Sequence, residues 1–268
     1  MVTIYKSGEQ FERKKGYLYL ECLGSGTGLN PELGNTSFIV STPESEARLL
    51  LDCGFTVTPK LVTQGRLKEI TDILISHPHS DHIGGLELMG FMSYFVFKAQ
   101  NPNYKLPRLH LASDKFNENL WKHCLKGTME KIQDLENVAR DSTLDMFFDV
   151  KTEQEVKIDG LPKITFKPTI HVQNMEAYSF VFDNGIYYSA DTVEVPPDGH
   201  ELIMQDVGFA KYKSQVHISL EELEKELNES VKKKTYLMHL GGGREKHDIK
   251  AKGFADFILP GDVIEMPL

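Results

Sequence analysis

The motif H-x-H-x-D-H at positions 77–82 constrains this chain more than any other stretch of the sequence, because it directly follows an apolar run at residues 73–76. A strand that ends in a turn can direct such side chains into one cleft, and imidazole with carboxylate is the ligand set of zinc and related metals. In an extended chain His77 and His79 point the same way, whereas the adjacent Asp81 and His82 should diverge. The spacing therefore favours two metal ions over one.

Stretches with the pattern of strands alternate along the chain with stretches of helical pattern. Strands are expected at residues 17–23, 36–41, 48–52, 73–76, 108–112, 164–167, 177–183, 186–189, 202–205 and 235–238. Helices are expected at 59–66, 86–98 and 219–227, and a further helix begins near Ser113, whose hydroxyl suits a helix N-cap. Two sheets facing each other, with helices outside, would accommodate this order. The sequence has no fixed-period repeat and no Pro/Ser-rich linker, which predicts a single domain over residues 1–268.

Three more candidate ligands stand where an expected strand opens into a loop. His171 ends the stretch 168–171, Asp191 follows the strand at 186–189, and His239 ends the stretch 236–239. A metal ion needs more than two protein groups, so these residues can complete the set that the motif begins. Taken singly, a histidine beside a strand is more often structural than a ligand. Their shared position at strand ends predicts that all of them gather at one edge of the stacked sheets.

The motif and the later candidate ligands, taken in order, resemble the metallo-β-lactamase superfamily over nearly the whole chain, including the lead-in Leu-Leu-Leu-Asp-Cys-Gly at 49–54. The resemblance implies an α/β fold, a four-layer αββα sandwich, that binds two zinc ions. Mn²⁺ or another divalent cation is an alternative to zinc. In that superfamily the first ion would be held by His77, His79 and His171, and the second by Asp81, His82 and His239, with Asp191 as the bridge.

His217 narrows the resemblance within the superfamily. It precedes an expected helix between Asp191 and His239, where it looks like the extra catalytic histidine of the tRNase Z-like phosphodiesterases. Asp206 resembles the acid that orients that histidine, and the glycine-rich opening at 23–28 is also similar to this branch, as is Asn-Thr-Ser at 35–37. A histidine in front of a helix can instead be a polar cap. The glycine-rich turn lacks the Lys-Ser/Thr ending of a phosphate-binding loop, so it is interpreted as a tight turn.

The chain also departs from tRNase Z, because only 20 positions separate His171 from Asp191 (191 − 171 = 20). That interval leaves no room for the long tRNA-gripping arm of tRNase Z. The compact chain looks most like the phage anti-Pycsar enzymes, which destroy cyclic pyrimidine or purine monophosphate signals. In that family the working unit is a homodimer whose partner helps to close the active site. The extra aromatic segment at 90–106 is an expected place for this contact, although a buried helix face is the simplest reading of its rings.

Composition agrees with a small substrate. The net charge of −9 argues against a surface that holds a long polyanion such as tRNA. Cys22, Cys53 and Cys124 are widely spaced and odd in number, which predicts reduced core thiols and no disulfide framework. The first residues lack the apolar core of a signal peptide, and no apolar run reaches the length of a membrane span. We therefore expect a cytoplasmic protein, in the host cytoplasm if a phage encodes it.

The expected function is that of a dinuclear metal phosphodiesterase that converts cyclic mononucleotides to nucleoside 5′-monophosphates. Asp81 would hold the proton of the attacking water, and His217, oriented by Asp206, would donate a proton to the leaving oxygen. Other hydrolases on the same scaffold stay open as alternatives: a phosphoribosyl cyclic phosphodiesterase, a tRNA 3′-processing endonuclease, a thioesterase or a lactonase. A nucleotide-binding sponge without turnover is a further alternative. The remaining histidines lack supporting partners in the sequence and are interpreted as surface or structural residues: His110, His123, His200 and His247.

Overall fold

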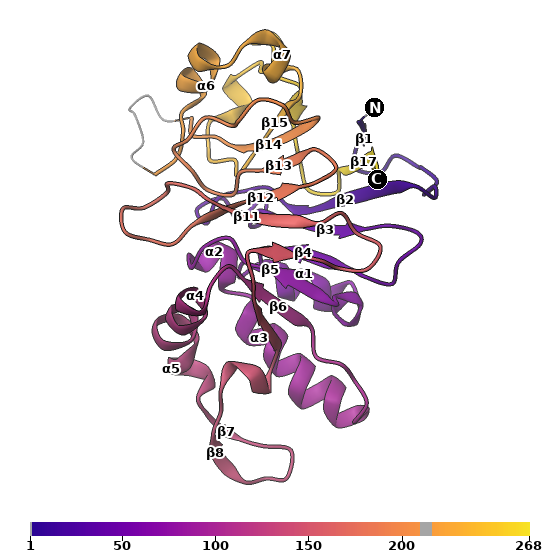
Figure 1. The fold of residues 1–268 in the computed structure, drawn as a ribbon, viewed down its shortest axis with the longest axis vertical. Helices are drawn as coiled ribbons and strands as arrows, with labels where there is room; N and C mark the ends of the chain where they lie inside the picture. The colour runs from indigo at the N-terminus through magenta and orange to yellow at the C-terminus, as the bar shows by residue number, and fades with distance from the viewer. Residues whose placement is uncertain (1, 210–215) are drawn as a thin grey trace.

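The computed structural model describes residues 2–209 and 216–268, and its strands form two large sheets that pack against each other (Figure 1). The eight-stranded sheet has the order β1 (Thr3–Tyr5), β17 (Val263–Pro267), β2 (Tyr17–Gly24), β3 (Ser37–Ser41), β4 (Leu49–Leu51), β5 (Asp72–Leu74), β6 (Arg108–Leu111) and β9 (Asp149–Thr152). The seven-stranded sheet has the order β10 (Glu155–Val156), β11 (Ile164–Pro168), β12 (Tyr178–Phe182), β13 (Ile186–Tyr188), β14 (Leu202–Asp206), β15 (Thr235–Met238) and β16 (Asp256–Phe257).

Helices lie on the outer side of each sheet. In Figure 1 the seven-stranded sheet is covered by α6 (Leu220–Glu226) and α7 (Glu229–Lys232), and the eight-stranded sheet by α1 (Val57–Thr63), α3 (Leu86–Phe91) and α4 (Asp114–Asn119). This order of layers confirms the predicted αββα sandwich. The other short elements are η1 (Leu67–Glu69), α2 (Ser80–Ile83), η2 (Met92–Lys98), η3 (Leu120–Leu125), α5 (Lys126–Met129), the hairpin β7 (Lys131–Gln133) with β8 (Ala139–Asp141), η4 (Leu144–Met146) and η5 (Arg244–Lys246).

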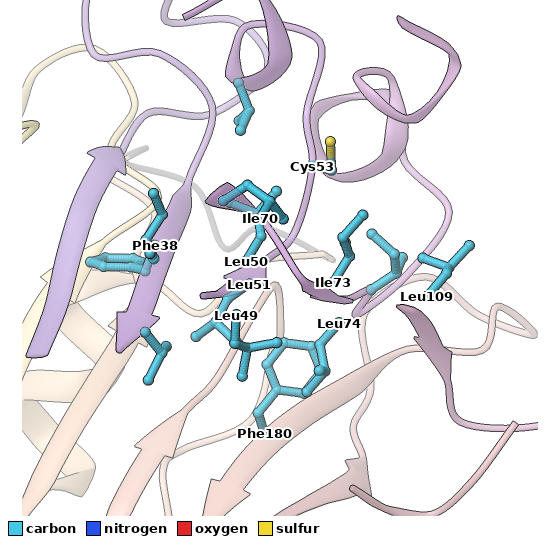
Figure 2. Packing of buried hydrophobic residues seen from close by; sticks show 14 of the residues in the cluster. Phe38, Leu49, Leu50, Leu51, Cys53, Ile70, Ile73, Leu74, Leu109 and Phe180 are labelled. Atoms are coloured by element: carbon cyan, nitrogen blue, oxygen red, sulfur yellow. The ribbon is translucent and has the colours of Figure 1, made fainter. Parts of the chain in front are cut away.

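Apolar central strands place the core between the two sheets. The run Leu49–Leu51 in β4 and the residues Ile73 and Leu74 in β5 are fully buried. Parallel strands that are covered on both faces carry such continuous apolar runs, because neither face meets water. Figure 2 shows these side chains together with Phe180 of β12, which comes from the opposite sheet, and one hydrophobic cluster includes residues of both sheets.

The strand directions bring several loops to one edge of the sandwich. Strands β4, β5 and β6 run parallel in one sheet, and β13, β14 and β15 run parallel in the other. Strand β11 has the same direction as β13, because both pair antiparallel with β12. In α/β folds the loops at the carboxyl ends of such strands form the ligand site.

Every predicted strand is present, with ends shifted by about two residues at most. The predicted helix cap at Ser113 is confirmed, because its Oγ accepts a hydrogen bond from Phe116 N at 3.0 Å. Ser219, expected as the first residue of a helix, is the N-cap of α6 and forms a capping box with Glu222. Seven short strands were not expected: β1, β7, β8, β9, β10, β16 and β17. Thr3 in the edge strand β1 pairs with Glu265 in β17, which itself pairs with β2, so distant partners and not a local apolar pattern select these two strands.

The aromatic segment at 90–106 packs into the core of its own chain. The predicted helix at 86–98 is present as α3 followed by the π-helix η2. The ring centroids of Phe91 and Tyr94 lie 5.5 and 5.7 Å from that of Phe147. These contacts support the reading of a buried helix face.

The prediction of three core thiols is wrong for Cys124. Cys22 and Cys53 are buried, and burial raises the pKa of Cys53 to about 12. Cys124 is exposed on η3, whose buried residues are Leu120 and Leu125.

A buried charge network joins strands β5 and β6. Nε2 of His110 lies 2.8 Å from Oδ1 of Asp72, and its Nδ1 lies 2.7 Å from Oε1 of Glu153. Burial alone would raise the pKa of Asp72, but hydrogen bonds from His110, Arg108 and Thr71 outweigh it and hold the pKa below 3.8. His110 is therefore structural, as predicted, but the expectation that it lacks partners is wrong, because those partners are distant in the sequence.

Replacing Asp72 with asparagine is expected to lower the free energy of unfolding by roughly 3 kcal/mol at neutral pH, because breaking a buried charge pair leaves its partners uncompensated. Since the folded-state pKa of Asp72 lies below its ordinary value of 3.8, this stabilisation is complete above that pH and is lost as the pH falls through the folded-state pKa. Urea unfolding of both proteins at about pH 7, 5 and 3 measures the difference.

The control is Asp149→Asn, which removes an exposed ion pair with Lys151 at 2.8 Å. Such a pair contributes at most about 1 kcal/mol. A difference between wild type and Asp72→Asn that stays constant below pH 3.8 would show that the charge of Asp72 is not the cause.

Candidate metal centre

The strand ends at the shared edge of the sandwich have an unusual backbone. The φ angles of Asp52, Ala190 and His239 are 56°, 50° and 55°. Asp52 follows β4, Ala190 precedes Asp191 after β13, and His239 follows β15. A left-handed backbone is costly for residues other than glycine, and such positions concentrate at functional sites.

Three imidazoles and one carboxylate oxygen form the first cluster. Nδ1 of His79 lies 3.1 Å from Nε2 of His77 and 3.1 Å from Nε2 of His171. Oδ2 of Asp191 lies 3.7 Å from both of those Nε2 atoms. A tetrahedron with metal–nitrogen bonds of about 2.0–2.1 Å has edges of about 3.3 Å, so this spacing suits one tetrahedral divalent ion.

The second cluster uses the other oxygen of Asp191. Nε2 of His82 and Nε2 of His239 lie 3.3 and 3.4 Å from Oδ1 of Asp191. Oδ2 of Asp81 lies 3.7 Å from the first of these nitrogens and 3.3 Å from the second. In each cluster the ligand atoms lie within 4.8 Å of one another. The structure therefore brings all the predicted ligands together, in the predicted division, with one carboxylate between the two groups.

Asp81 and His82 do not diverge, contrary to the expectation for an extended chain. The residues Ser80–Ile83 form the short helix α2, and His79 is its extended N-cap. The period of two that holds in a strand therefore stops at His79. On the helix, Asp81 and His82 both reach the second cluster.

Buried polar atoms without partners fit a metal ion at this place. Among the described residues, Nε2 of His82 and Oδ1 of Asp191 are buried and make no hydrogen bond. Such atoms are costly to leave unpaired, and both face the second cluster. Burial opposes a charge on His239, but Asp191, Asp206 and Asp81 together outweigh it and raise the pKa of His239 to about 10. The buried carboxylates thus draw positive charge to this cluster, which a divalent cation would also supply.

His217 lies beside the clusters and is held by Asp206. Its Nδ1 is 2.8 Å from Oδ2 of Asp206 and 4.0 Å from Oδ2 of Asp191. The His217 side chain is 25% exposed, whereas that of Asp206 is fully buried. Burial opposes a charge on the imidazole, but the hydrogen bond and charge of Asp206 outweigh it and raise the pKa of His217 above 6.5. The structure therefore places the two residues as the predicted pair.

Two supporting groups were not recognised from the sequence. Asp52 accepts a hydrogen bond from Ser76 N at 2.8 Å and lies 2.9 Å from Nδ1 of His82. The backbone N of Gly28 donates to Oδ2 of Asp81 at 2.8 Å, and a Cβ at Gly28 would lie 3.1 Å from that carboxylate. The lead-in at 49–54 was the available signal for Asp52. For Gly28 there was no local signal, since a glycine-rich turn alone indicates only a tight reversal.

Replacing Asp52 with asparagine is expected to weaken metal affinity by about 10–100-fold, because a carboxylate behind a ligand histidine orients the ring and raises its basicity. Asparagine keeps the size of the side chain and tolerates the left-handed backbone. Competition with a chromophoric chelator measures the affinity. The matched control is Asp72→Asn. Asp72 begins β5, the parallel neighbour of β4, so it lies at the other end of these strands from Asp52, and the variant should keep its metal affinity despite lower stability. Equal affinities of the two variants would contradict this role of Asp52.

A family model for the anti-Pycsar protein Apyc1 matches residues 18–264. The chain belongs to this family. Among its relatives is the anti-Pycsar protein Apyc1 of Paenibacillus harenae, which is 34% identical over 239 residues, or 84% of this chain and 90% of the relative. The protein of the same name from Bacillus phage 010DV004 is 29% identical over 259 residues, or 90% of this chain and 96% of the relative. The Apyc1 match spans every residue of both clusters and confirms the resemblance that the ordered ligands indicated.

Solved structures share the fold of this Apyc1-family chain. The metallo-β-lactamase fold protein YhfI of Bacillus subtilis superimposes with a TM-score of 0.68 at 16% identity, covering 93% of this chain and 100% of that one. The short form of human tRNase Z gives a TM-score of 0.63 at 17% identity, with coverage of 93% and 100%. These likenesses concern the fold alone and confirm it as the metallo-β-lactamase fold. Within residues 2–209 and 216–268, no helix has the length and apolarity needed to cross a membrane.

Proposed function

We propose that this Apyc1-family protein is a metal-dependent phosphodiesterase that hydrolyses cyclic mononucleotides to nucleoside 5′-monophosphates and thereby counters a cyclic-nucleotide antiviral defence. The observation that carries the proposal is the pairing of His217 with Asp206 at 2.8 Å beside the double His/Asp cluster. A ribose oxygen leaves poorly unless it is protonated, and an oriented imidazolium supplies that proton. The anti-Pycsar name of the relatives and the net charge of −9 agree with a small signalling nucleotide.

We propose two Zn²⁺ ions per chain, with Mn²⁺ or another divalent cation as the alternative. Bound there, two divalent cations supply the positive charge that neutralises a phosphodiester and acidifies a water molecule for in-line attack. The first would be held by His77, His79 and His171, and the second by Asp81, His82 and His239, with Asp191 shared through its two oxygens.

The protein's own groups move the protons of this reaction. Water adds a hydroxyl to phosphorus and the bond from phosphorus to the ribose 3′ oxygen breaks, so one proton leaves the water and one reaches the 3′ oxygen. His217 donates the second proton from Nε2, because Asp206 holds Nδ1. Asp81 accepts the first. Among the described residues its polar contacts all use Oδ2, which leaves Oδ1 for the water.

The decisive experiment is incubation of the Zn²⁺-loaded protein with cyclic mononucleotides, cyclic dinucleotides, a thioester, a lactone and a pre-tRNA, with products separated by chromatography. We expect nucleoside 5′-monophosphates from the cyclic mononucleotides, and no product after treatment with a chelator. Cleavage of the pre-tRNA, the thioester or the lactone alone would overturn the choice of substrate. Recovery of bound but intact cyclic nucleotide from the metal-loaded protein would indicate a nucleotide-binding sponge.

We also propose that the protein works as a cytoplasmic homodimer, as the resemblance implies. The rings of the segment at 90–106 pack largely into the core, so exposed apolar side chains beside the clusters are better candidates for the contact with a second copy. Leu29, next to Gly28, is 96% exposed, and Ile170, next to His171, is 59% exposed. Light scattering should give a mass near twice the chain mass of 30.4 kDa. A monomer mass at working concentration would contradict this proposal.

A further inference from the structure

Thr192 is fully buried directly after the shared Asp191, and the proposed chemistry does not use its side chain. A buried hydroxyl needs partners, because leaving it unpaired is costly. The partners of Thr192 come from three segments that carry other groups of the site. Thr192 therefore links three segments of the site to the loop that carries Asp191.

The backbone of Thr192 contacts the proton-donating pair. Its N–H donates to Oδ2 of Asp206 at 3.0 Å, and the same oxygen lies 2.8 Å from Nδ1 of His217. Its carbonyl accepts a hydrogen bond at 2.8 Å from the N–H of Ile218, the residue after His217. These bonds set the positions of Asp206 and His217 relative to Asp191.

The hydroxyl of Thr192 contacts the strand end that carries His171. Its Oγ1 lies 2.6 Å from Oγ1 of Thr169 and 3.2 Å from the carbonyl oxygen of Ile170. The Thr169 hydroxyl donates to Oε2 of Glu194 at 2.7 Å, and the single proton of the Thr192 hydroxyl is shared between Oγ1 of Thr169 and the carbonyl oxygen of Ile170. The N–H of Glu194 in turn donates to Oγ1 of Thr192 at 3.0 Å. Thr192, Thr169 and Glu194 thus close a ring of hydrogen bonds.

We propose that Thr192 is a positioning residue that holds His171, Asp206 and His217 in register with the shared Asp191. His171 belongs to the first cluster, whereas Asp206 and His217 form the proton-donating pair. The ring of hydrogen bonds fixes the strand end that carries His171, and the backbone of Thr192 fixes Asp206 and His217. The expected effect on turnover rests on the proposed function, but the expected effect on metal binding does not.

Replacing Thr192 with valine removes the hydroxyl at nearly constant volume. The hydroxyl of Thr169 and the N–H of Glu194 then each lose Thr192 Oγ1 as a hydrogen-bond partner. We expect Zn²⁺ affinity to fall by about 10–100-fold, the usual effect of losing a group that orients a metal ligand. Cyclic nucleotide turnover should show a lower kcat with little change in KM, since the substrate contacts are unaltered. Thr192→Ser keeps the hydroxyl and should restore most of both quantities.

The matched control is Thr235→Val. Thr235 is equally buried, its hydroxyl donates to the carbonyl oxygen of Val231 at 2.9 Å, and it begins β15 while His239 follows the end of that strand. It should lower the Tm about as much as Thr192→Val but leave Zn²⁺ affinity and kcat unchanged. Chelator competition measures the Zn²⁺ affinity. The imidazole NMR signals of the Zn²⁺-loaded protein report the local environment of the His171 and His217 rings.

Equal Zn²⁺ affinities and equal kcat values in Thr192→Val and Thr235→Val would overturn the proposal. If Thr192→Val does not fold, Glu194→Ala breaks the same ring from its exposed end. Wild-type affinity in Glu194→Ala, or a failure of Thr192→Ser to restore it, would then count against the role of the ring. If the wild-type protein cleaves no cyclic nucleotide, the proposed function fails, whereas the metal titrations still decide the role of Thr192.

Discussion

Loss of bound metal together with loss of activity is the expected result of replacing His82 with alanine. Nε2 of His82 faces Oδ1 of Asp191 at 3.3 Å and has no hydrogen-bond partner among the described residues. Its removal takes one of the two imidazoles from the second cluster. Because a catalytic metal contributes several kcal/mol of transition-state stabilisation, we expect turnover to fall by about a thousandfold or more. Elemental analysis of the purified variant measures the metal content, and chromatography measures hydrolysis.

His110→Ala is the matched control for this variant. His110 is also a buried histidine of the eight-stranded sheet that contacts carboxylates, at 2.8 Å from Asp72 and 2.7 Å from Glu153. Its removal should reduce the stability but leave the metal content and the turnover per folded molecule unchanged. Full metal content with normal turnover in His82→Ala would remove His82 from the ligand set.

Replacing His217 with alanine is expected to lower turnover by about a hundredfold or more while both metal ions stay bound, because the leaving ribose oxygen loses its proton donor. His217 contacts the clusters from their edge, with its Nδ1 4.0 Å from Asp191, and it is held mainly by Asp206. Asp206→Asn, like His217→Ala, should lower turnover. Elemental analysis must show that His217→Ala keeps its metal, so that the two histidine variants separate metal binding from proton donation.

A substrate with a good leaving group makes this separation sharper. The phenolate that leaves from bis(p-nitrophenyl) phosphate needs no proton, so His217→Ala should hydrolyse it nearly as well as the wild type. His82→Ala should fail with both substrates. Normal turnover of cyclic nucleotides by metal-replete His217→Ala, or an equal loss with the activated substrate, would rule out the role of His217 as the acid.

The order of the ligands along the chain could be predicted because each one comes after a strand whose apolar pattern is local. The runs at Leu49–Leu51 and Ile73–Leu74 identify buried parallel strands, and parallel strands bring the loops at their carboxyl ends to one edge of the sheet. The same kind of local pattern predicted the cap at Ser113. Prediction failed where pairing partners are distant, as for β1 with β17, and where burial depends on packing, as for the exposed Cys124.

The ligand types, their order, and the presence of His217 between Asp191 and His239 were determined by the sequence alone, because residue chemistry and strand periodicity are local properties. Only the tertiary structure decides that Asp191 directs one oxygen toward each cluster. It also decides that Asp81 and His82 converge, because both lie on helix α2. The hydrogen bond from the backbone N–H of Gly28 to the carboxylate of Asp81, 53 positions later, likewise exists only in the folded protein. Contacts of this kind join segments far apart in the chain, and their geometry exists only after both sheets have packed.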